Sequence, residues 1–287
     1  MDFRPILLGD VATCAEIFWA ADDDLMLRAG LPPNPRNEAR LFSLFEHIVA
    51  NDPERGWLAE NDGQPTGFAM SVQRGDLTFL AMLFVMPKAQ ARGLGRELLE
   101  RSMAESSRRA VSIFSVQPIS GALYAQYGMV PLVPMYTMTG RPRVELPALA
   151  DSLTVGPVEA AAVDPIDLEV TGFTRQVDHA AWQAWGRVRF GLFEGGELAG
   201  YGYAQQAGRI GPVMVRRPEL VLPFVGQLMK EIEPVEDWML NVPGPAAEPF
   251  ESLLKAGMRF DGPPIIYCAT DGRTDHSRYM PATFALP

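Results

Sequence analysis

Apolar positions in the first part of the chain follow a helical spacing and then a strand-like spacing. A strand is expected over residues 3–8, and a helix begins after Asp10, a typical N-cap residue, with Val11 and Cys14 on its apolar face. A second helix is expected over residues 37–50. Three strand-like runs follow, separated by the turn sequences NDGQP and RGD, at residues 56–60, 66–73 and 77–86.

The segments after this antiparallel meander alternate between helix and strand. Helices are expected over residues 93–109 and 120–128, and strands over residues 111–117 and 129–138. A meander followed by alternating helices and strands indicates an α/β (α+β) fold with a mixed sheet.

Composition and charge narrow the class of protein. The 287 residues are 47% hydrophobic and 21% charged, which is typical of a globular chain of one large or two medium domains. The net charge of −10 argues against a nucleic-acid partner and suits a cationic or amine-bearing small molecule. Cys14 and Cys268 stand alone, so we expect buried thiols and neither a disulfide framework nor a metal site.

The hydropathy pattern predicts the compartment. The first residues, MDFRPILLGD, lack the apolar core of a signal peptide, and no run of about 18 apolar residues occurs in the chain. We therefore expect a soluble, cytoplasmic protein with no membrane partner.

The stretch QARGLGR, residues 90–96, lies where a strand ends and a helix begins. Backbone N–H groups at such a turn, with the partial positive charge of a helix N-terminus, form an anion site. Gly93 and Gly95 let the main chain approach the anion, and Arg92 and Arg96 add positive charge. The pattern predicts a diphosphate ligand.

The spacing of the glycines distinguishes between the known types of phosphate-binding loop that this turn could be. A nucleotide P-loop requires G-x-x-x-x-G-K-[ST], which the chain lacks. Leu98 replaces the third glycine of the dinucleotide fingerprint, and an initial meander does not suit a Rossmann unit. A turn glycine in a plain strand–helix connection is a further alternative. The sequence LFVMPKAQARGLGRELLE closely resembles the coenzyme A loop of the GNAT acetyltransferase superfamily, with its V-x-P strand end and Q/R-x-x-G-x-G/A turn.

A second stretch, QPISGALYAQYGMVPL, is similar to a later GNAT motif. Gln117 takes the place of an Asn at the end of a splayed strand, Tyr124 that of a helical Tyr, and Gly128-Met129 that of Gly-Phe. The two motifs occur in the family's order, and the resemblance covers residues 1–140.

The resemblance implies an acetyl-CoA-binding domain and assigns residues to it. In the family, the strand residues that match Leu83, Phe84 and Val85 pair through their backbones with the pantetheine arm, and the tyrosine lies near the sulfur. We therefore expect Tyr124 to be the general acid, with a packed helix tyrosine as the alternative. The expected coenzyme-binding residues are Leu83, Phe84, Val85, Gln90, Ala91, Arg92, Gly93, Leu94, Gly95, Arg96, Gln117 and Tyr124.

The sequence does not single out a general base. Many relatives carry a Glu on the strand before the coenzyme loop, but LTFLAMLFV has no acid and only Asp76 precedes it. Ordered water, Glu46 or His47 are the alternatives. The acidic run of residues 22–24 is expected in a loop after the first helix, where relatives line the acceptor pocket, with helix capping and solvation as the preferred interpretation.

The second half repeats the first in a degenerate form. Residues 141–162 are predicted to be a linker with one short strand, and the order meander, helix, strand, helix, strand then recurs. Val215 lies almost as far before Gly257 as Val85 lies before Gly128. Leu253 stands in the place of Tyr124, and RRPELVLPF has no glycine where the phosphate turn would be. An unrelated α/β domain is the alternative.

The sequence thus predicts two tandem GNAT-like domains, with the catalytic domain at residues 1–140 and a degenerate domain at residues 163–287. The second domain is expected to wall the acceptor pocket, with Trp182, Trp185 and Trp238 in that wall or in the core. The predicted function is acetyl-CoA-dependent N-acetyltransferase acting on a primary amine of a small molecule. The alternative is a non-catalytic acyl-CoA-binding sensor or scaffold, and a homodimer is left open.

Overall fold

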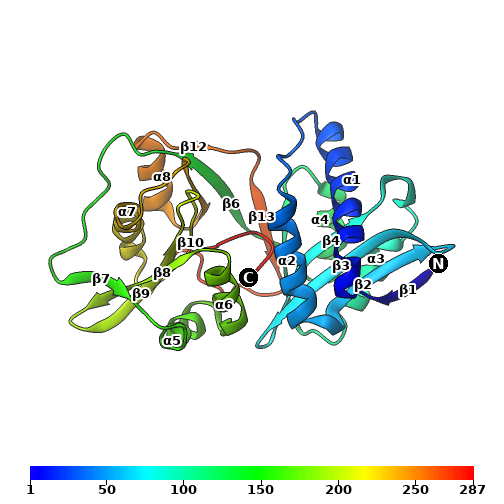
Figure 1. Ribbon diagram of the computed structural model, residues 1–287, viewed down its shortest axis with the longest axis horizontal. Helices are drawn as coiled ribbons and strands as arrows, with labels where there is room; N and C mark the ends of the chain where they lie inside the picture. Colours follow the sequence, from blue (N-terminus) through cyan, green and yellow to red (C-terminus); the bar gives the residue numbers. More distant parts are fainter. The chain divides into compact units, whose positions relative to one another are not determined.

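The computed structural model describes all 287 residues, and the chain divides into two compact units. The first consists of residues 1–111 and 126–128, and the second of residues 112–125 and 129–287. Figure 1 labels most of the elements of both units. The domain limits expected from the sequence, at residues 140 and 162, stay a prediction.

The first unit is built on a twisted sheet with the strand order β1-β2-β3-β4-β5. Neighbouring strands are antiparallel, except β4 and β5, which are parallel. Its elements are β1 (Asp2–Pro5), α1 (Val11–Ala29), α2 (Glu38–Asn51), β2 (Gly56–Asn61), β3 (Gln64–Arg74), β4 (Leu77–Val85), α3 (Leu94–Ser102) and β5 (Arg108–Phe114), with single 3₁₀ turns at Leu8–Asp10, Pro53–Arg55 and Pro87–Ala89.

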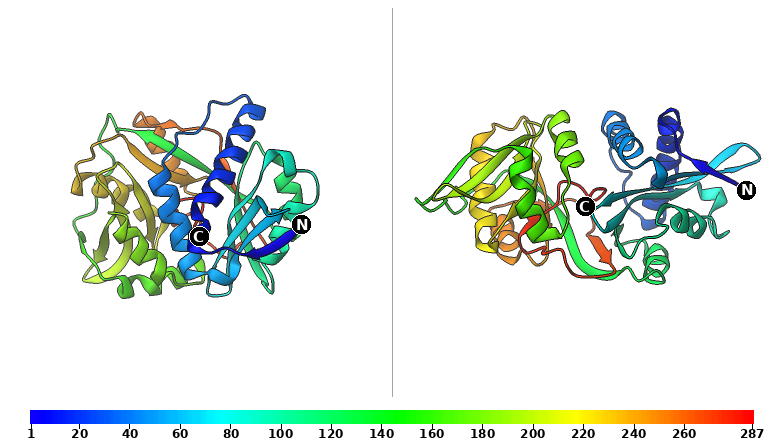
Figure 2. Two further views of the ribbon diagram at one scale, coloured as in Figure 1. Left: turned by 45° about the vertical axis from the view of Figure 1, so that its right-hand side comes forward. Right: turned by 90° about the horizontal axis from the view of Figure 1, so that it is seen from below.

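Helices cover both faces of this sheet. α1 and α2 lie on one face and α3 lies on the other, as the second view of Figure 2 shows. An aromatic cluster fills the space under α1 and α2. The ring centroids of Phe18 and Phe84 are 4.7 Å apart and those of Phe45 and Phe68 are 5.5 Å apart, both pairs edge to face. This packing fixes the half of β4 that leads into the glycine turn.

Strand β4 carries a bulge that changes its pairing. Its register against β3 shifts between Met70 and Ser71, which leaves Ala81 as the extra residue. The pairing with β5 covers only Leu77–Leu80. The half of β4 beyond the bulge therefore has one hydrogen-bonding edge that neither β3 nor β5 occupies.

The second unit holds a five-stranded sheet with the order β14-β10-β9-β8-β7, and β6 pairs with β11, β12 and β13. Its elements are α4 (Pro118–Ala125), β6 (Val130–Gly140), β7 (Leu153–Pro157), α5 (Ala160–Thr171), α6 (Gln176–Ala184), β8 (Val188–Glu194), β9 (Glu197–Ala204), β10 (Ile210–Val215), a 3₁₀ turn (Pro218–Leu220), α7 (Val221–Glu231), β11 (Trp238–Pro243), α8 (Ala247–Lys255), β12 (Arg259–Phe260), β13 (Ile265–Ala269) and β14 (Tyr279–Met280).

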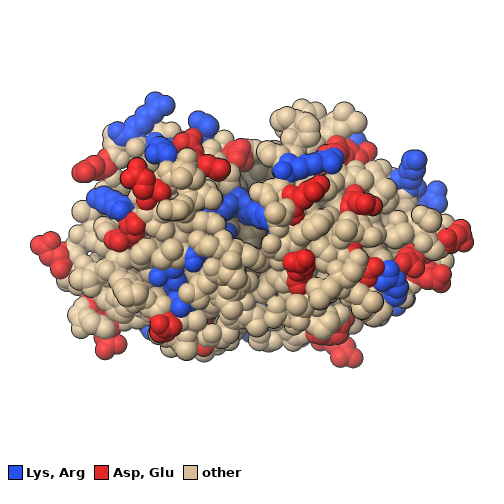
Figure 3. Space-filling model, in the orientation of Figure 1, with Lys and Arg blue, Asp and Glu red and all other residues tan.

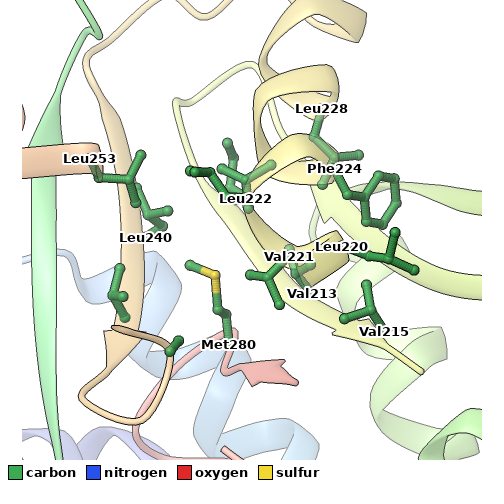
Figure 4. Packing of buried hydrophobic residues seen from close by; sticks show 14 of the residues in the cluster. Val213, Val215, Leu220, Val221, Leu222, Phe224, Leu228, Leu240, Leu253 and Met280 are labelled. Carbon is green, nitrogen blue, oxygen red and sulfur yellow. The ribbon is translucent and has the colours of Figure 1, made fainter. Parts of the chain in front are cut away.

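Two apolar clusters stabilise the second unit. One joins α7 to β10 and β11, and Figure 4 shows Leu222 and Phe224 of α7 beside Val213 of β10. The other joins α5 and α6 to β9. Trp238 belongs to the first cluster and Trp182 to the second, with exposures of 4% and 1%. Of the tryptophans considered for a pocket wall, these two are therefore core residues.

The first helix differs from its prediction in two ways. It begins after Asp10 as expected, but the Asp10 side chain does not cap it and instead accepts hydrogen bonds from Arg4 and from the Leu7 amide. The placement of residues 22–24 in a loop is wrong, because α1 continues through them to Gly30. Gly30, with φ of +68°, is the left-handed residue that ends the helix.

Helix α3 is shorter than predicted. It ends at Ser102, and β5 begins at Arg108 instead of residue 111. Arg108 is buried, lies opposite Leu77 in the parallel ladder and donates to Asp76 at 3.2 Å. This pairing extends the strand backwards and stops the helix.

Helices α5 and α6 were not predicted. α5 begins at Ala160, inside the segment expected to be a linker, and contains Pro165. A proline inside a helix removes an N–H donor, so the local sequence favours a loop. Burial of Val163, Ile166 and Val170 in the cluster with β9 outweighs that preference.

Candidate active site

The turn from β4 to α3 has the backbone shape that its glycines predict. Gly93 is the N-cap of α3 with φ of +82°, a left-handed conformation that glycine adopts without strain. Ala91 is also left-handed, with φ of +62°. A Cβ atom built on Gly93 or Gly95 would meet no atom within 4 Å, so open space faces both residues.

Five successive amides in this turn have no acceptor in the chain. The amides of Ala91, Arg92, Gly93, Leu94 and Gly95 make no hydrogen bond, whereas the next two amides, those of residues 96 and 97, donate to the Gly93 carbonyl at 3.0 and 3.2 Å. Unpaired N–H groups at a helix N-terminus form an anion-binding site, and the helix dipole adds to it. The residues present therefore fit a coenzyme diphosphate.

Polar side chains hold the turn in place. Gln90 Nε2 donates to the Val85 carbonyl at 3.0 Å and so ties the turn to the end of β4. Arg96 is held by Gln126 at 2.7 Å. Arg92 is exposed and has no hydrogen-bond or ion-pair partner within the chain, so its guanidinium is free to meet an anion.

The structure adds one residue that the sequence did not indicate. Arg28, in the last turn of α1, lies 3.4 Å from Gln90 Oε1 and forms an ion pair with Asp24 at 2.8 Å. The spacing of Asp24 and Arg28 is visible in the sequence as a helical i, i+4 pair. The contact with Gln90 depends on the tertiary fold and has no sequence signal.

The strand residues Leu83, Phe84 and Val85 are half-buried and follow the bulge at Ala81. Their position past the end of the β5 pairing leaves the second edge of the strand without a partner strand. An extended ligand with amide groups, such as a pantetheine arm, matches such an edge by adding backbone hydrogen bonds.

Tyr124 and Gln117 belong to α4 and its start, in the second unit. The Gln117 carbonyl accepts from the Gly121 amide at 3.2 Å and so opens the helix. Tyr124 is 5% exposed, and its hydroxyl makes no hydrogen bond within the chain. Burial raises its pKa above the ordinary value for tyrosine, so the hydroxyl keeps its proton at neutral pH.

None of the expected base candidates stands in an activating environment. Glu46 is exposed, and His47 Nδ1 lies 3.1 Å from Asn51 Nδ2. Asp76 is paired with buried Arg108.

The carboxylates of the acidic run in α1, residues 22–24, have polar partners within the chain. The Asp22 carboxylate is buried, which raises its pKa, and accepts from Asn34 Nδ2 at 3.1 and 3.0 Å. Asp23 is paired with Arg36 at 2.5 Å. These contacts hold the segment before α2 against α1.

The corresponding turn of the second unit has different chemistry. After Val215, the guanidinium of Arg216 is paired with Glu169, and that of Arg217 is paired with Glu194 and Glu219. The Leu220 amide donates to the Arg217 carbonyl at 3.1 Å. Leu253, in the place of Tyr124, is fully buried. This turn therefore has neither the run of five acceptor-less amides nor the unpaired arginine of its counterpart.

A mixed sheet with a bulged, half-open strand and an amide-rich turn before a helix is an arrangement suited to an anionic coenzyme. Residues 16–129 match the model of the acetyltransferase (GNAT) family. The matched stretch is therefore similar to the GNAT acetyltransferase family, and acetyl-CoA is the acyl donor that this family uses.

Solved structures extend the likeness of fold to both halves. A putative acetyltransferase from Pyrococcus horikoshii superimposes with a TM-score of 0.77 at 16% identity, over 100% of this chain and 95% of that one. A GCN5-related N-acetyltransferase from Sphaerobacter thermophilus gives 0.62 at 16%, over 96% of each chain. A tandem GNAT protein from the clavulanic acid biosynthesis pathway gives 0.56 at 17%, over 96% and 99%. The predicted mixed-sheet, tandem GNAT fold is confirmed.

Two kinds of feature are absent from the structure. No helix combines the length and hydrophobicity needed to span a bilayer. No three His, Cys, Asp or Glu side chains are grouped so that they could hold a metal ion.

Proposed function

We propose that the chain is an acetyl-CoA-dependent N-acetyltransferase that acetylates a primary amine of a small molecule. The observation that carries the proposal is the run of five acceptor-less amides, Ala91 to Gly95, at the N-terminus of α3. These amides would hold the diphosphate, and Arg92 would add a charge-assisted contact. The open edge of Leu83–Val85 would hold the pantetheine arm.

Bound at this turn, acetyl-CoA supplies an activated acetyl group. Preorganised backbone donors on the β4 edge are suited to stabilising negative charge on an acyl oxygen. Tyr124 is the side chain to which we assign proton donation, because its hydroxyl is protonated at neutral pH and has no partner within the chain. Gln117 would orient this end of the site through α4.

The acceptor is proposed to be an amine because of the charge of the chain. The net charge of −10 favours a cationic ligand, although acidic and basic side chains are mixed over the face that Figure 3 shows. We further propose that the acceptor is a small molecule and that the protein is cytoplasmic. The choice between monomer and homodimer is left open.

A non-catalytic acyl-CoA-binding sensor or scaffold is the second candidate. It is favoured by β4, which carries no carboxylate, and by the pairing of Asp76 with Arg108. In this case the coenzyme site would be kept without turnover. The Tyr124 hydroxyl favours the enzyme, because it makes no hydrogen bond within the chain and is therefore available to a bound ligand.

Thiol release from acetyl-CoA across a panel of small amines separates the two candidates. The enzyme predicts release that depends on both the protein and one class of amine, with an acetylated amine found by mass spectrometry. Tight binding of acetyl-CoA with no amine-dependent release would contradict the enzyme and support the sensor.

A further inference from the structure

A short strand late in the sequence covers one edge of the second unit's sheet. We call residues 278–282 the β14 strap. β14 pairs antiparallel with Val213 and Met214 of β10. The amide of Val215 donates to the Arg278 carbonyl at 3.1 Å. The strap therefore pairs with the last part of β10, immediately before the strand ends.

This part of β10 corresponds to the proposed coenzyme edge of the first unit. The repeat that aligns Val85 with Val215 places Leu83–Val85 on Val213–Val215. Both β4 and β10 pair antiparallel with the strand before them, and both pairings contain a register shift. The edge that is open in β4 is the edge that the strap occupies in β10.

Buried polar side chains hold the strap. Asn241 Nδ2 donates to the Pro281 carbonyl at 3.2 Å, and Arg187 donates to the Ala282 carbonyl at 3.4 Å. Gly211 of β10 has φ of +122°, and a Cβ atom there would lie 3.1 Å from the Pro281 carbonyl oxygen. The strap therefore passes so close to β10 that only a glycine at position 211 leaves room for it. The carbonyl groups of Pro281 and Ala282 both accept hydrogen bonds from buried side chains.

The side chains of the strap enter both apolar clusters. Tyr279, 3% exposed, accepts a hydrogen bond of 2.7 Å from the buried guanidinium of Arg175 on the face covered by α5 and α6. Met280, 1% exposed, lies on the other face with Leu240 and Val221, as Figure 4 shows. Alternate residues thus bury opposite faces, as in a strand that is covered on both faces.

We infer that the β14 strap fills, in the second unit, the backbone edge that receives the pantetheine arm in the first. The assignment of the pantetheine arm to the edge of β4 rests on the proposed function. The pairing of the strap with the edge of β10 does not depend on it. The second unit is then a coenzyme fold closed by its own chain. Loss of the glycine turn and occupation of the edge both exclude a second coenzyme there.

Hydrogen exchange of the full chain, with and without saturating acetyl-CoA, tests the inference. Amides of residues 213–215 and 278–280 should exchange on the order of a hundredfold more slowly than in an unstructured peptide, because paired, buried amides exchange only on local opening. Acetyl-CoA should not change their exchange. It should slow exchange in residues 82–97.

A variant and a control sharpen the test. Arg278→Ala removes the contacts of the strap with Glu169 and Asp275 and should speed exchange at residues 213–215 by about tenfold. Arg273→Ala, at a side chain that is 61% exposed, should not.

The outcomes distinguish the strap from the proposed function. Fast exchange at residues 213–215 without ligand, or slower exchange there once acetyl-CoA is added, would overturn the inference. Protection of residues 213–215 with no response of residues 82–97 would support the strap and contradict the proposed function instead.

Discussion

Tyr124 is the residue on which the proposed chemistry depends most. Tyr124→Phe keeps the packing of the ring and removes only the hydroxyl, so acetyl-CoA affinity should change little. The kcat should fall on the order of 10²-fold, the usual loss for a positioned proton donor. Steady-state kinetics with the amine identified by thiol release, together with calorimetric binding of acetyl-CoA, would measure both effects.

Tyr127 offers a matched control for this substitution. Its hydroxyl is bonded to Glu100, so Tyr127→Phe removes a tyrosine hydroxyl that already has a structural partner. The control should retain full kcat. If Tyr124→Phe also stays within a factor of about three, the tyrosine is structural and another group supplies the proton.

His276 should make stability depend on pH. It is 5% exposed, with Nδ1 3.1 Å from the Thr274 carbonyl oxygen, and burial lowers its pKa from 6.5 to about 4. The unfolded chain therefore binds a proton at a higher pH than the folded chain. The free energy of unfolding should fall as pH drops below 6.5, and the contribution is lost fully below about 4.

Denaturant unfolding at pH 7 and pH 5 measures this effect. The histidine should account for a loss of about 2 kcal/mol between the two values. His276→Phe keeps an aromatic ring beside Tyr267, at 4.6 Å from the histidine ring in the native protein, and cannot titrate. A pH dependence that is the same in both proteins would show that other groups cause it.

At the residue scale, sequence could predict positions that backbone geometry restricts. Gly93 was predictable because a strand-to-helix turn with a left-handed residue favours glycine. The pairing of Asp22 with Asn34 and of Arg28 with Gln90 was not, because these contacts join segments whose approach is set by helix packing. The absence of a partner for the Tyr124 hydroxyl is likewise a property of the folded chain.

The turn between β4 and α3 is the element that the coenzyme proposal rests on. Gly93→Val places a β-branched residue at φ of +82° and fills the open space beside the free amides. Acetyl-CoA affinity should fall by tenfold or more, which is about 1.4 kcal/mol. Calorimetric titration would measure the change.

Gly63 provides the control for backbone strain. It lies in the β2–β3 turn with φ of +75° and open space around it, so Gly63→Val carries a similar local cost at a distance in sequence from the coenzyme turn. This variant should lose stability and keep its affinity. If Gly93→Val and the native chain bound acetyl-CoA with equal affinity, the turn would not be part of the binding site.

At the scale of elements, the apolar periodicity of the sequence predicted those helices and strands that the local sequence determines. The first two helices and the strands of the meander each have an apolar spacing that fits only one type of element. The order of the repeat follows from such elements in sequence. α5 was missed because Pro165 argues against a helix and only tertiary burial compensates for it. β14 was missed because a strand of two residues has no periodicity.

The whole molecule combines two units of GNAT-like fold, and in the second unit the β14 strap pairs with the edge of β10. The tandem fold was predictable because two motifs and a repeated order of elements extend over most of the chain. The closure of the second unit was not, since it depends on residues 278–282 returning to pair with β10. A sequence repeat indicates that a fold is duplicated. Whether the strand edge of each copy is open or covered depends on pairing between residues that are far apart in the sequence.

Isothermal titration of acetyl-CoA into the intact chain tests the central claim most directly. The account predicts one binding site per chain, with an affinity that Gly93→Val weakens by tenfold or more and that Gly63→Val leaves unchanged. Two sites per chain, or a single site that is indifferent to Gly93→Val, would contradict the assignment of the coenzyme to the β4–α3 turn.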